Sequence, residues 1–157
     1  MKVHLIVIGK TTQDFVEKGM NEFHHRLQHY LSFEIKIIPD IKSTKSLSFE
    51  QQKEKEGELI LKMLKPTDYI VLLDERGKEF SSVKFAEYLE KKTHSIPKSL
   101  VFIIGGPYGF SSKVYDMAHE KISLSKMTFS HQLIRLIFVE QLYRAMTILH
   151  NEPYHHE

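Results

Sequence analysis

Residues 100–109 read LVFIIGGPYG. An uninterrupted apolar run that ends in glycine and proline is typical of a strand covered on both faces, as in a parallel sheet flanked by helices. Residues 69–73 (YIVLL) show the same apolar pattern, and a turn at residues 74–77 (DERG) is predicted to end this second strand. The two runs therefore predict the central strands of a parallel sheet.

The remaining sequence alternates between predicted strands and predicted helices. β-branched residues predict strands at residues 3–9 and 33–39, and a weaker strand is predicted at residues 121–124. Apolar residues spaced three and four apart predict helices between the strands, and a long helix is predicted over residues 130–150. This order predicts the α/β class, with one domain over residues 1–157 and a mainly parallel sheet of five or six strands flanked by helices on both faces.

Serines mark the predicted starts of several helices. Ser48 and Gln51 have the spacing of a capping box, and Ser81 or Ser82 is expected to cap the next helix. The first helix is expected to turn one apolar stripe toward the sheet, formed by Val16, Met20, Phe23, Leu27 and Tyr30.

Composition limits the classes of function. The 157 residues carry 22 Lys and Arg against 20 Asp and Glu, so the net charge of +2 gives little sign of a free-standing nucleic-acid binder. The absence of Cys excludes disulfides, thiolate metal sites and a cysteine nucleophile, and it favours the cytoplasm.

No apolar run approaches the ~18–20 residues of a membrane span, and residues 1–9 lack the features of a signal peptide. His25 and His29 lie four apart on a helix but lack the carboxylate of an H-E-x-x-H motif, so no metal site is predicted.

Three loops follow predicted strands, at the edge where open parallel sheets bind ligands. Residues 74–77 offer two acids that could accept hydrogen bonds from a ribose; the alternative is a hydrophilic turn with Gly77 at positive φ. Residues 105–109 carry three glycines that leave the backbone open to a ligand; the alternative is a tight turn before a helix. Residues 124–129 (LSKMTF) could form an apolar slot for an adenine or a thioether; the alternative is core packing.

Several segments together resemble a known family over essentially the whole chain. In order they are IVIGK, EKEGELIL, LLDERGKEFSS, VFIIGGPYGF, ISLSKMTFSHQLIRLIFVEQLYRA and NEPYHH, and SKMTFSHQLIR is the most specific. They resemble the ribosomal RNA large subunit methyltransferase H family. The resemblance implies a SPOUT-type α/β knot with a C-terminal trefoil knot, in which the end of the chain is threaded through a loop. It also implies a homodimer that uses S-adenosylmethionine to methylate N3 of a pseudouridine in 23S ribosomal RNA, on the assembled ribosome and without a metal.

The resemblance also implies which residues contact the methyl donor. They belong to the three loops described above. The expected donor contacts are Leu73, Gly105, Leu124, Ser125, Lys126, Met127, Thr128 and Phe129.

Several residues are candidates for the catalytic group, because the imide proton of the target base needs either a general base or a cation that stabilises the anion. The C-terminal tail ranks first, with His155 and Tyr154, because a tail packed near the donor loop could close over the base; the alternative is a frayed terminus. Arg144 is a candidate anion stabiliser, and His131 is a candidate whose alternative role is packing at a helix start.

Other residues are expected to serve RNA binding or dimer formation. Candidate phosphate contacts, each with an alternative role as an ordinary surface cation, are Lys10, Lys126, Arg135 and Arg144. In the final helix, Ile134 and Phe138 are expected to face the sheet and leave Ile137, Val139 or Tyr143 for a partner. Two other functions stay open: a non-catalytic ribosome-associated binding protein with the same fold, and a flavodoxin-like nucleotide or phosphate binder.

Overall fold

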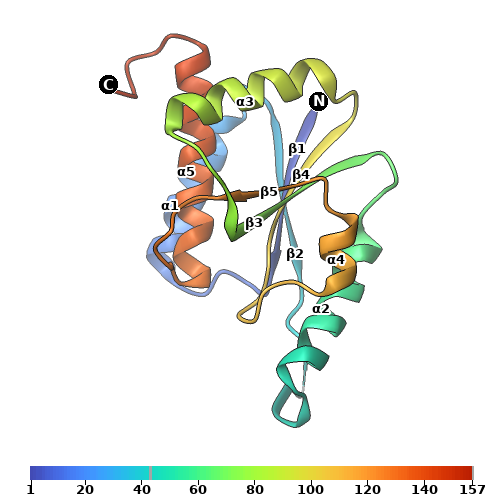
Figure 1. The fold of residues 1–157 in the computed structure, drawn as a ribbon. Helices are drawn as coiled ribbons and strands as arrows, with labels where there is room; N and C mark the ends of the chain where they lie inside the picture. The colour runs from blue at the N-terminus through green and yellow to red at the C-terminus, as the bar shows by residue number, and fades with distance from the viewer. Residues whose placement is uncertain (43, 157) are drawn as a thin grey trace.

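The computed structural model describes residues 1–42 and 44–156 (Figure 1). Strands and helices alternate along the chain, as predicted. Their bounds are β1 Lys2–Ile8, α1 Asp14–Leu27, β2 Ser32–Ile38, the 3-10 turn η1 Thr44–Ser46, α2 Phe49–Met63, β3 Asp68–Glu79, α3 Ser82–Ser95, β4 Ser99–Ile104, α4 Ser112–Met117, β5 Glu120–Ser123 and α5 His131–Leu149.

The five strands form one parallel sheet in the order β2-β1-β4-β3-β5. The predicted parallel α/β architecture is therefore confirmed, and the apolar run of β4 lies at its centre. Successive residues of β4 face opposite sides: Phe102 packs in one hydrophobic cluster and Val101 in the other. Both central runs can be apolar throughout because helices cover both faces.

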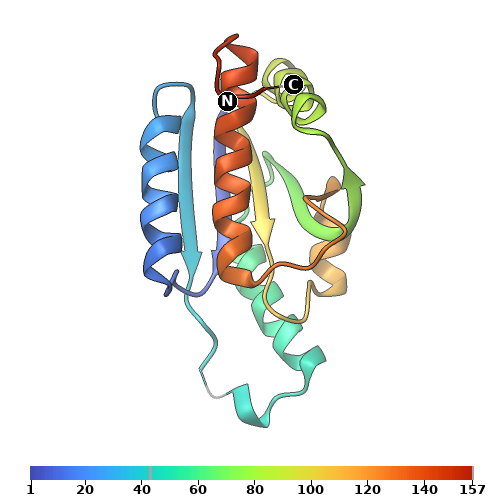
Figure 2. The ribbon, with the colours of Figure 1, turned by 90° about the vertical axis from the view of Figure 1, so that its left-hand side faces the viewer.

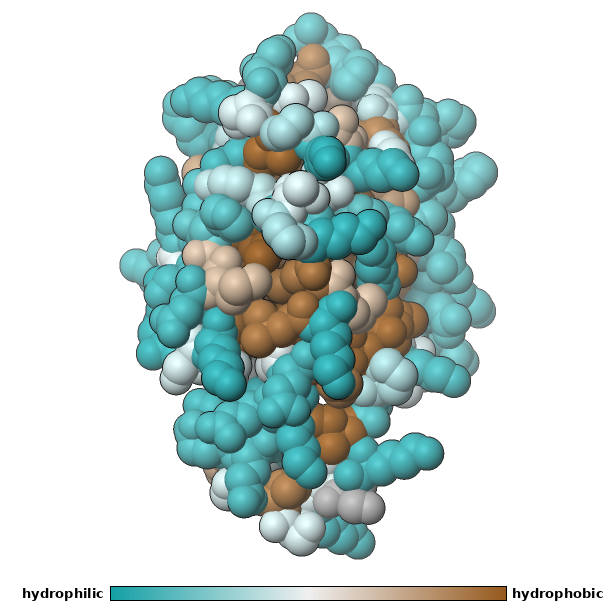
Figure 3. Space-filling model, turned by 90° about the vertical axis from the view of Figure 1, so that its right-hand side faces the viewer, coloured by the Kyte–Doolittle hydropathy of each residue, from teal (hydrophilic) through white to brown (hydrophobic). Residues whose placement is uncertain are grey.

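The two faces of the sheet are covered unequally. On one face, α1 and α3 both pack against α5, whose course beside the sheet is visible in Figure 2. The other face carries α2 and α4, and Figure 3 shows hydrophobic side chains gathered at its surface. Met117 on α4 remains 46% exposed there. The α1–α3–α5 face therefore carries the larger part of the core.

Strand β3 differs from its prediction. The expected turn at residues 74–77 is wrong, because the chain stays in β-structure as far as Glu79. Both Leu73 and Lys78 pair with Ile122 of β5, so an irregularity rather than a turn lies between them. Gly77 does not have the positive φ expected of it; a Cβ there would lie 2.6 Å from the backbone nitrogen of Ile122. Close approach of two strands therefore requires this glycine.

The predicted helix starts are confirmed. Ser48 and Gln51 form both hydrogen bonds of a capping box, and Ser81 caps α3. Ser130 caps α5 by accepting a hydrogen bond from the Leu133 amide at 3.1 Å. These predictions are confirmed because a cap depends only on residues three positions apart.

Two residues of α5 are placed differently from prediction. Val139 was a candidate for a partner surface but is fully buried in this chain. Arg135, a candidate phosphate contact, is 2% exposed and donates to the carbonyl oxygens of Ile8 and Gly9 and to the hydroxyl of Thr11. It cannot reach an RNA phosphate from there, because its guanidinium holds the end of β1 against α5.

Candidate functional site

The three predicted segments line one cavity of about 780 Å³, which lies beside the irregularity within β3 and at the carboxyl ends of β4 and β5. This volume falls in the ~300–1,000 Å³ range of small-molecule pockets. All eight residues expected to contact the methyl donor are among the lining residues. The lining comprises residues 73–76, 104–110 and 123–131, with Tyr115 and Ile134.

The glycine loop forms both the tight turn and one wall of the cavity. The amide of Gly109 donates to the carbonyl of Gly106 at 3.2 Å, and Gly109 has a φ of +86°, which favours glycine. A Cβ on Gly105 would lie 3.0 Å from the ring of Phe110. The two interpretations of this loop are therefore compatible, since the turn exposes backbone groups to the cavity.

The loop after β5 is held by short-range hydrogen bonds. The hydroxyl of Ser123 donates to the carbonyl of Ser125 at 2.9 Å, and the Met127 amide donates to the hydroxyl of Ser125 at 2.9 Å. Met127 is 76% exposed, so it is not core packing. Lys126 lies at the exposed rim, 3.7 Å from Glu79. This geometry leaves an apolar side chain available to cover a ligand.

The polar groups of the cavity include two that sequence reasoning missed, Arg76 and Tyr115. Tyr115 donates to Asp74, and its pKa is raised by burial and by that hydrogen bond. Asp74 also accepts from the Arg76 amide at 2.8 Å, whereas the exposed Glu75 accepts a longer bond of 3.4 Å from Thr128. Glu75 is therefore the more accessible of the two acids. Arg76 lies within the LLDERGKEFSS segment that carries the family resemblance but was assigned no role there, and Tyr115 lies outside the segments quoted for the resemblance.

A buried acid supports the glycine loop from behind. Glu56 of α2 is only 4% exposed, and its Oε1 has no hydrogen-bond partner among the residues that the structure describes. A Cβ on Gly106 would lie 2.5 Å from that oxygen. Burial raises the pKa of Glu56, and the charge of Asp40 adds to the increase, while a hydrogen bond from Gln52 opposes it. The highly charged stretch around Glu56 gives no sign of this burial in the sequence.

Glu56 makes the stability of the fold depend on pH. The folded state keeps its proton at pH values where the unfolded chain has lost it, so the free energy of unfolding falls as pH rises from about 4.5 through the raised pKa. Glu56→Gln has no carboxyl group to ionise, so it avoids this loss of stability. At pH 8 we expect its melting temperature to exceed that of the wild type by about 2–4 °C for each 1 kcal/mol of unfolding free energy that the wild type has lost. The difference should vanish near pH 4. Glu58→Gln, on the exposed side of the same helix, is the control, and an equal effect of both variants at both pH values would contradict this role of Glu56.

The candidate catalytic residues lie at opposite ends of α5. His131 begins the helix and lines the cavity, and its pKa is lowered by burial and by the charge of Arg135. Arg144 lies thirteen residues further along, which is about 20 Å at the rise of an α-helix. Figure 2 shows the tail beyond that distant end of α5. The tail of this chain therefore does not close over its own cavity, in contrast to our expectation.

The three candidates of the distant end form one cluster around Glu140. Arg144 donates to Glu140 Oε1 at 2.6 Å, and the hydroxyl of Tyr154 donates to the same oxygen at 3.0 Å. Nη1 of Arg144 lies 3.2 Å from Nδ1 of His155, and its guanidinium lies 4.7 Å from the centre of the Tyr154 ring. The tail is thus packed on α5 and is not a frayed terminus.

Lys10, a candidate phosphate contact, is exposed. Its carbonyl oxygen accepts a hydrogen bond from Gln132 at the start of α5, so Lys10 lies at the cavity end of the molecule.

Within residues 1–42 and 44–156, no group of three metal-ligating side chains is present, and no helix is long and apolar enough to cross a membrane.

Comparisons with known proteins agree with this architecture. A family model described as "Predicted SPOUT methyltransferase" matches residues 1–155. Two proteins named ribosomal RNA large subunit methyltransferase H are similar over the full length of both chains: one from Parabacteroides distasonis is 68% identical, and one from Flavobacterium johnsoniae is 58% identical. A probable methylase family protein from Haemophilus influenzae Rd KW20 shares the fold, with a TM-score of 0.52 and 11% identity over 99% of this chain and 70% of that one. The chain therefore belongs to the ribosomal RNA large subunit methyltransferase H family of SPOUT methyltransferases.

Proposed function

We propose that this protein is an S-adenosylmethionine-dependent methyltransferase that modifies N3 of a pseudouridine in 23S ribosomal RNA. It acts in the cytoplasm on the assembled ribosome, as a homodimer with the α/β knot of its superfamily. The observation that supports the proposal most directly is the single cavity formed by the three loops of the family motifs. Full-length similarity to proteins named for this class of reaction supports it independently.

The cavity has the chemistry that a nucleoside sulfonium requires. Leu124, Met127 and Phe129 supply apolar surface for an adenine and a thioether, and the glycine loop brings backbone groups within reach of polar edges. Glu75 is an exposed acid at the same cavity and can accept hydrogen bonds from a ribose. The donor, when bound, supplies an electrophilic methyl group on its sulfonium.

The residues of the chain then have two tasks, positioning and proton removal. Holding the acceptor nitrogen in line with the methyl–sulfur bond lowers the barrier by avoiding the entropy cost of a bimolecular encounter. The N3–H bond would break with its proton passing to a base, the nitrogen lone pair would form the new bond to the methyl carbon, and the methyl–sulfur bond would break with its electrons left on sulfur, so that the donor departs as a neutral thioether. His155 is our first candidate for the base, and Arg144 would stabilise the imide anion.

We propose that these residues act on a second copy of the chain. Arg144 lies ten residues beyond Ile134, a lining residue of the cavity, which is about 15 Å at the rise of an α-helix, and His155 contacts Arg144, so we place the tail of one protomer at the cavity of its partner. Ile137 and Tyr143 on α5 are half-buried apolar side chains that a partner could cover. Sedimentation of the purified protein at micromolar concentration should show a dimer, and a monomer alone would contradict this arrangement.

The proposal is tested by methyl transfer to its substrate. Purified protein is incubated with labelled S-adenosylmethionine and ribosomes that lack the modification, and the labelled nucleotide is mapped. We expect label on N3 of one pseudouridine in 23S ribosomal RNA. Label on another base would overturn the specificity, and donor binding without transfer would favour a non-catalytic ribosome-associated protein. Calorimetry that detects no donor binding would instead favour a flavodoxin-like nucleotide binder.

A further inference from the structure

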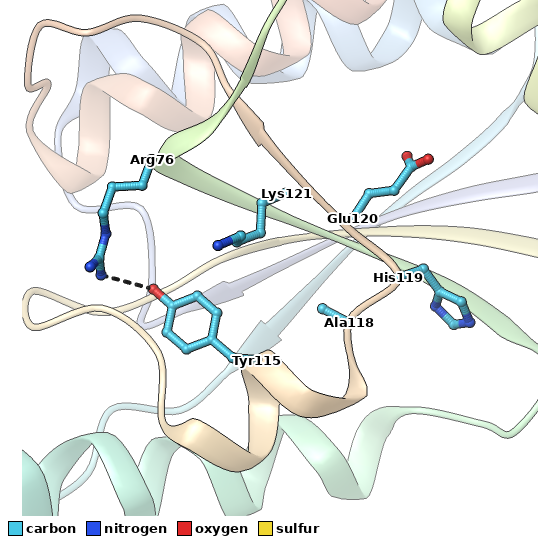
Figure 4. Close-up of a pocket in the computed structure, with 6 residues that line it drawn as sticks. All are labelled: Arg76, Tyr115, Ala118, His119, Glu120 and Lys121. Carbon is cyan, nitrogen blue, oxygen red and sulfur yellow. Dashed lines mark hydrogen bonds between the residues drawn. The ribbon is translucent and has the colours of Figure 1, made fainter.

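A second hollow lies beside the donor cavity, along the edge strand β5. We call it the β5 hollow; it has a volume of about 460 Å³ and is lined by Arg76, Tyr115, Ala118, His119, Glu120 and Lys121 (Figure 4). Arg76 and Tyr115 line both spaces, so the hollow adjoins the donor cavity along these two side chains. A polymer that enters one space can therefore continue into the other.

Two cations face this hollow. The side chain of Arg76 is 80% exposed, and its Nη2 lies 3.4 Å from the hydroxyl of Tyr115. The ammonium of Lys121 lies 5.5 Å from the centre of the Tyr115 ring. Figure 4 shows both side chains on the same side of β5, with Tyr115 beneath them. The two positive groups thus converge on one aromatic floor.

The acids near the hollow are already occupied. Asp74 has a side chain only 8% exposed and accepts from Tyr115 and from the Arg76 amide. Glu120 points away from Lys121 in Figure 4, and its Oε1 accepts from Lys92 at 2.8 Å on the other side of the strand. Within residues 1–42 and 44–156, no carboxylate forms an ion pair with Lys121. Arg76 is partly neutralised by Asp74, whose Oδ1 lies 3.8 Å from its Nε, so Lys121 is the cation of the hollow that has no carboxylate partner among these described residues.

The far rim of the hollow is fixed by His119. Its Nδ1 accepts a hydrogen bond from the Ile70 amide at 3.0 Å, and its ring stacks on Tyr69 with centroids 4.4 Å apart. In the neutral ring the proton is therefore on Nε2, which is a donor. Cationic side chains and hydrogen-bond donors are the groups that contact phosphate oxygens in protein–nucleic acid interfaces.

We propose that the β5 hollow binds a backbone phosphate of the substrate RNA strand, next to the target nucleotide, through Arg76 and Lys121. This inference rests on the proposed function, because it assigns the path of the same strand beyond the donor cavity. The phosphate contact sets the register of the strand, so that the target base enters the cavity and its neighbour does not. The contact carries no base specificity.

The test is the effect of Lys121→Gln on ribosome recognition. Lys121 does not line the donor cavity, so we expect the dissociation constant for S-adenosylmethionine to stay within twofold of the wild type. The KM for unmodified ribosomes should rise about tenfold with kcat within threefold. The slope of log KM against log salt concentration should decrease by roughly 0.7–0.9, the value for one lost phosphate contact. Lys121→Arg, which keeps the charge, should restore most of the affinity.

A matched control and the contrary outcomes complete the test. Lys91→Gln removes one charge from an exposed residue of α3, on the opposite face of the sheet, and should leave the KM and the salt slope unchanged. A KM and salt slope of Lys121→Gln equal to those of the wild type would overturn the inference. So would a change in dimer sedimentation without a change in KM, since the hollow would then be a protein interface. Failure of the proposed function itself is recognised separately, because the wild type would then transfer no methyl group to ribosomes.

Discussion

His155→Ala is expected to reduce methylation of ribosomes at least ~100-fold, the lower range of what a general base contributes. Donor binding measured by calorimetry should remain within twofold of the wild type, because His155 is assigned to the proton of the target base and is not among the residues that line the donor cavity. The fold should be retained, since the side chain is only half-buried and contacts Arg144 at the end of the chain. The measurement is single-turnover methyl transfer with saturating donor.

The control for this prediction is His156→Ala, the exposed neighbouring histidine, which should keep nearly full activity. Full activity of His155→Ala would remove His155 from the mechanism. A loss of methyl-transfer activity in both variants would indicate a general effect of the tail on folding or dimer formation. Measurements of melting temperature and sedimentation would reveal such an effect.

Mixed dimers test whether the tail acts on the partner. Leu124→Arg should abolish activity by itself, because it places a cation in the cavity that must accept the positive sulfonium. A dimer of one Leu124→Arg protomer and one His155→Ala protomer contains one intact cavity that faces the intact tail of the partner. We expect this dimer to recover up to half of the wild-type activity. An inactive mixed dimer, formed from two folded variants, would show that each tail serves its own chain.

Arg135→Met is expected to destabilise the protein by about 3 kcal/mol, which lowers the melting temperature by roughly 6–12 °C for a chain of this size. The substitution keeps much of the side-chain volume but removes three donated hydrogen bonds. Two of them, at 2.6 and 2.9 Å, go to the carbonyls of Ile8 and Gly9, which are then left without these donors at a buried position. Thermal and urea unfolding measure the effect.

The control is Lys84→Met, which also replaces a cation by methionine. Lys84 is paired with Glu87 at 3.0 Å, but both side chains are largely exposed, and such pairs contribute at most ~1 kcal/mol. If Arg135→Met cost no more than Lys84→Met, the interaction of Arg135 with β1 would not stabilise the fold. Arg135→Lys, which keeps the charge without the forked geometry, should fall between the wild type and Arg135→Met.

Local sequence patterns predicted the strands, the helix caps and the order of the elements. The apolar runs of β3 and β4 identify central strands because residues buried on both faces must all be apolar. Ser48, Ser81 and Ser130 identify helix starts because each cap is completed within three residues. The donor loops could be located because the carboxyl ends of parallel strands meet at one edge of a sheet.

The same patterns failed where a residue depends on partners distant in the sequence. The charged run around Glu56 predicts solvent exposure, but packing of α2 beneath the glycine loop buries this acid beside Gly106. The charge of Arg135 predicts a surface cation, yet the carbonyls at the end of β1 make its burial favourable. The sequence of α5 by itself does not identify such partners.

Sequence by itself therefore determined the parallel α/β architecture, the three segments that line the cavity and the family to which the chain belongs. Only the tertiary structure decided that Arg76 and Tyr115 line both the donor cavity and the β5 hollow, and that the tail packs beside Arg144, toward the end of α5 opposite the cavity of its own chain. The physical reason is the range of the interactions. Caps and apolar periodicity act over a few residues, whereas a cavity or a buried ion is formed by groups that only the packing of the whole sheet brings together.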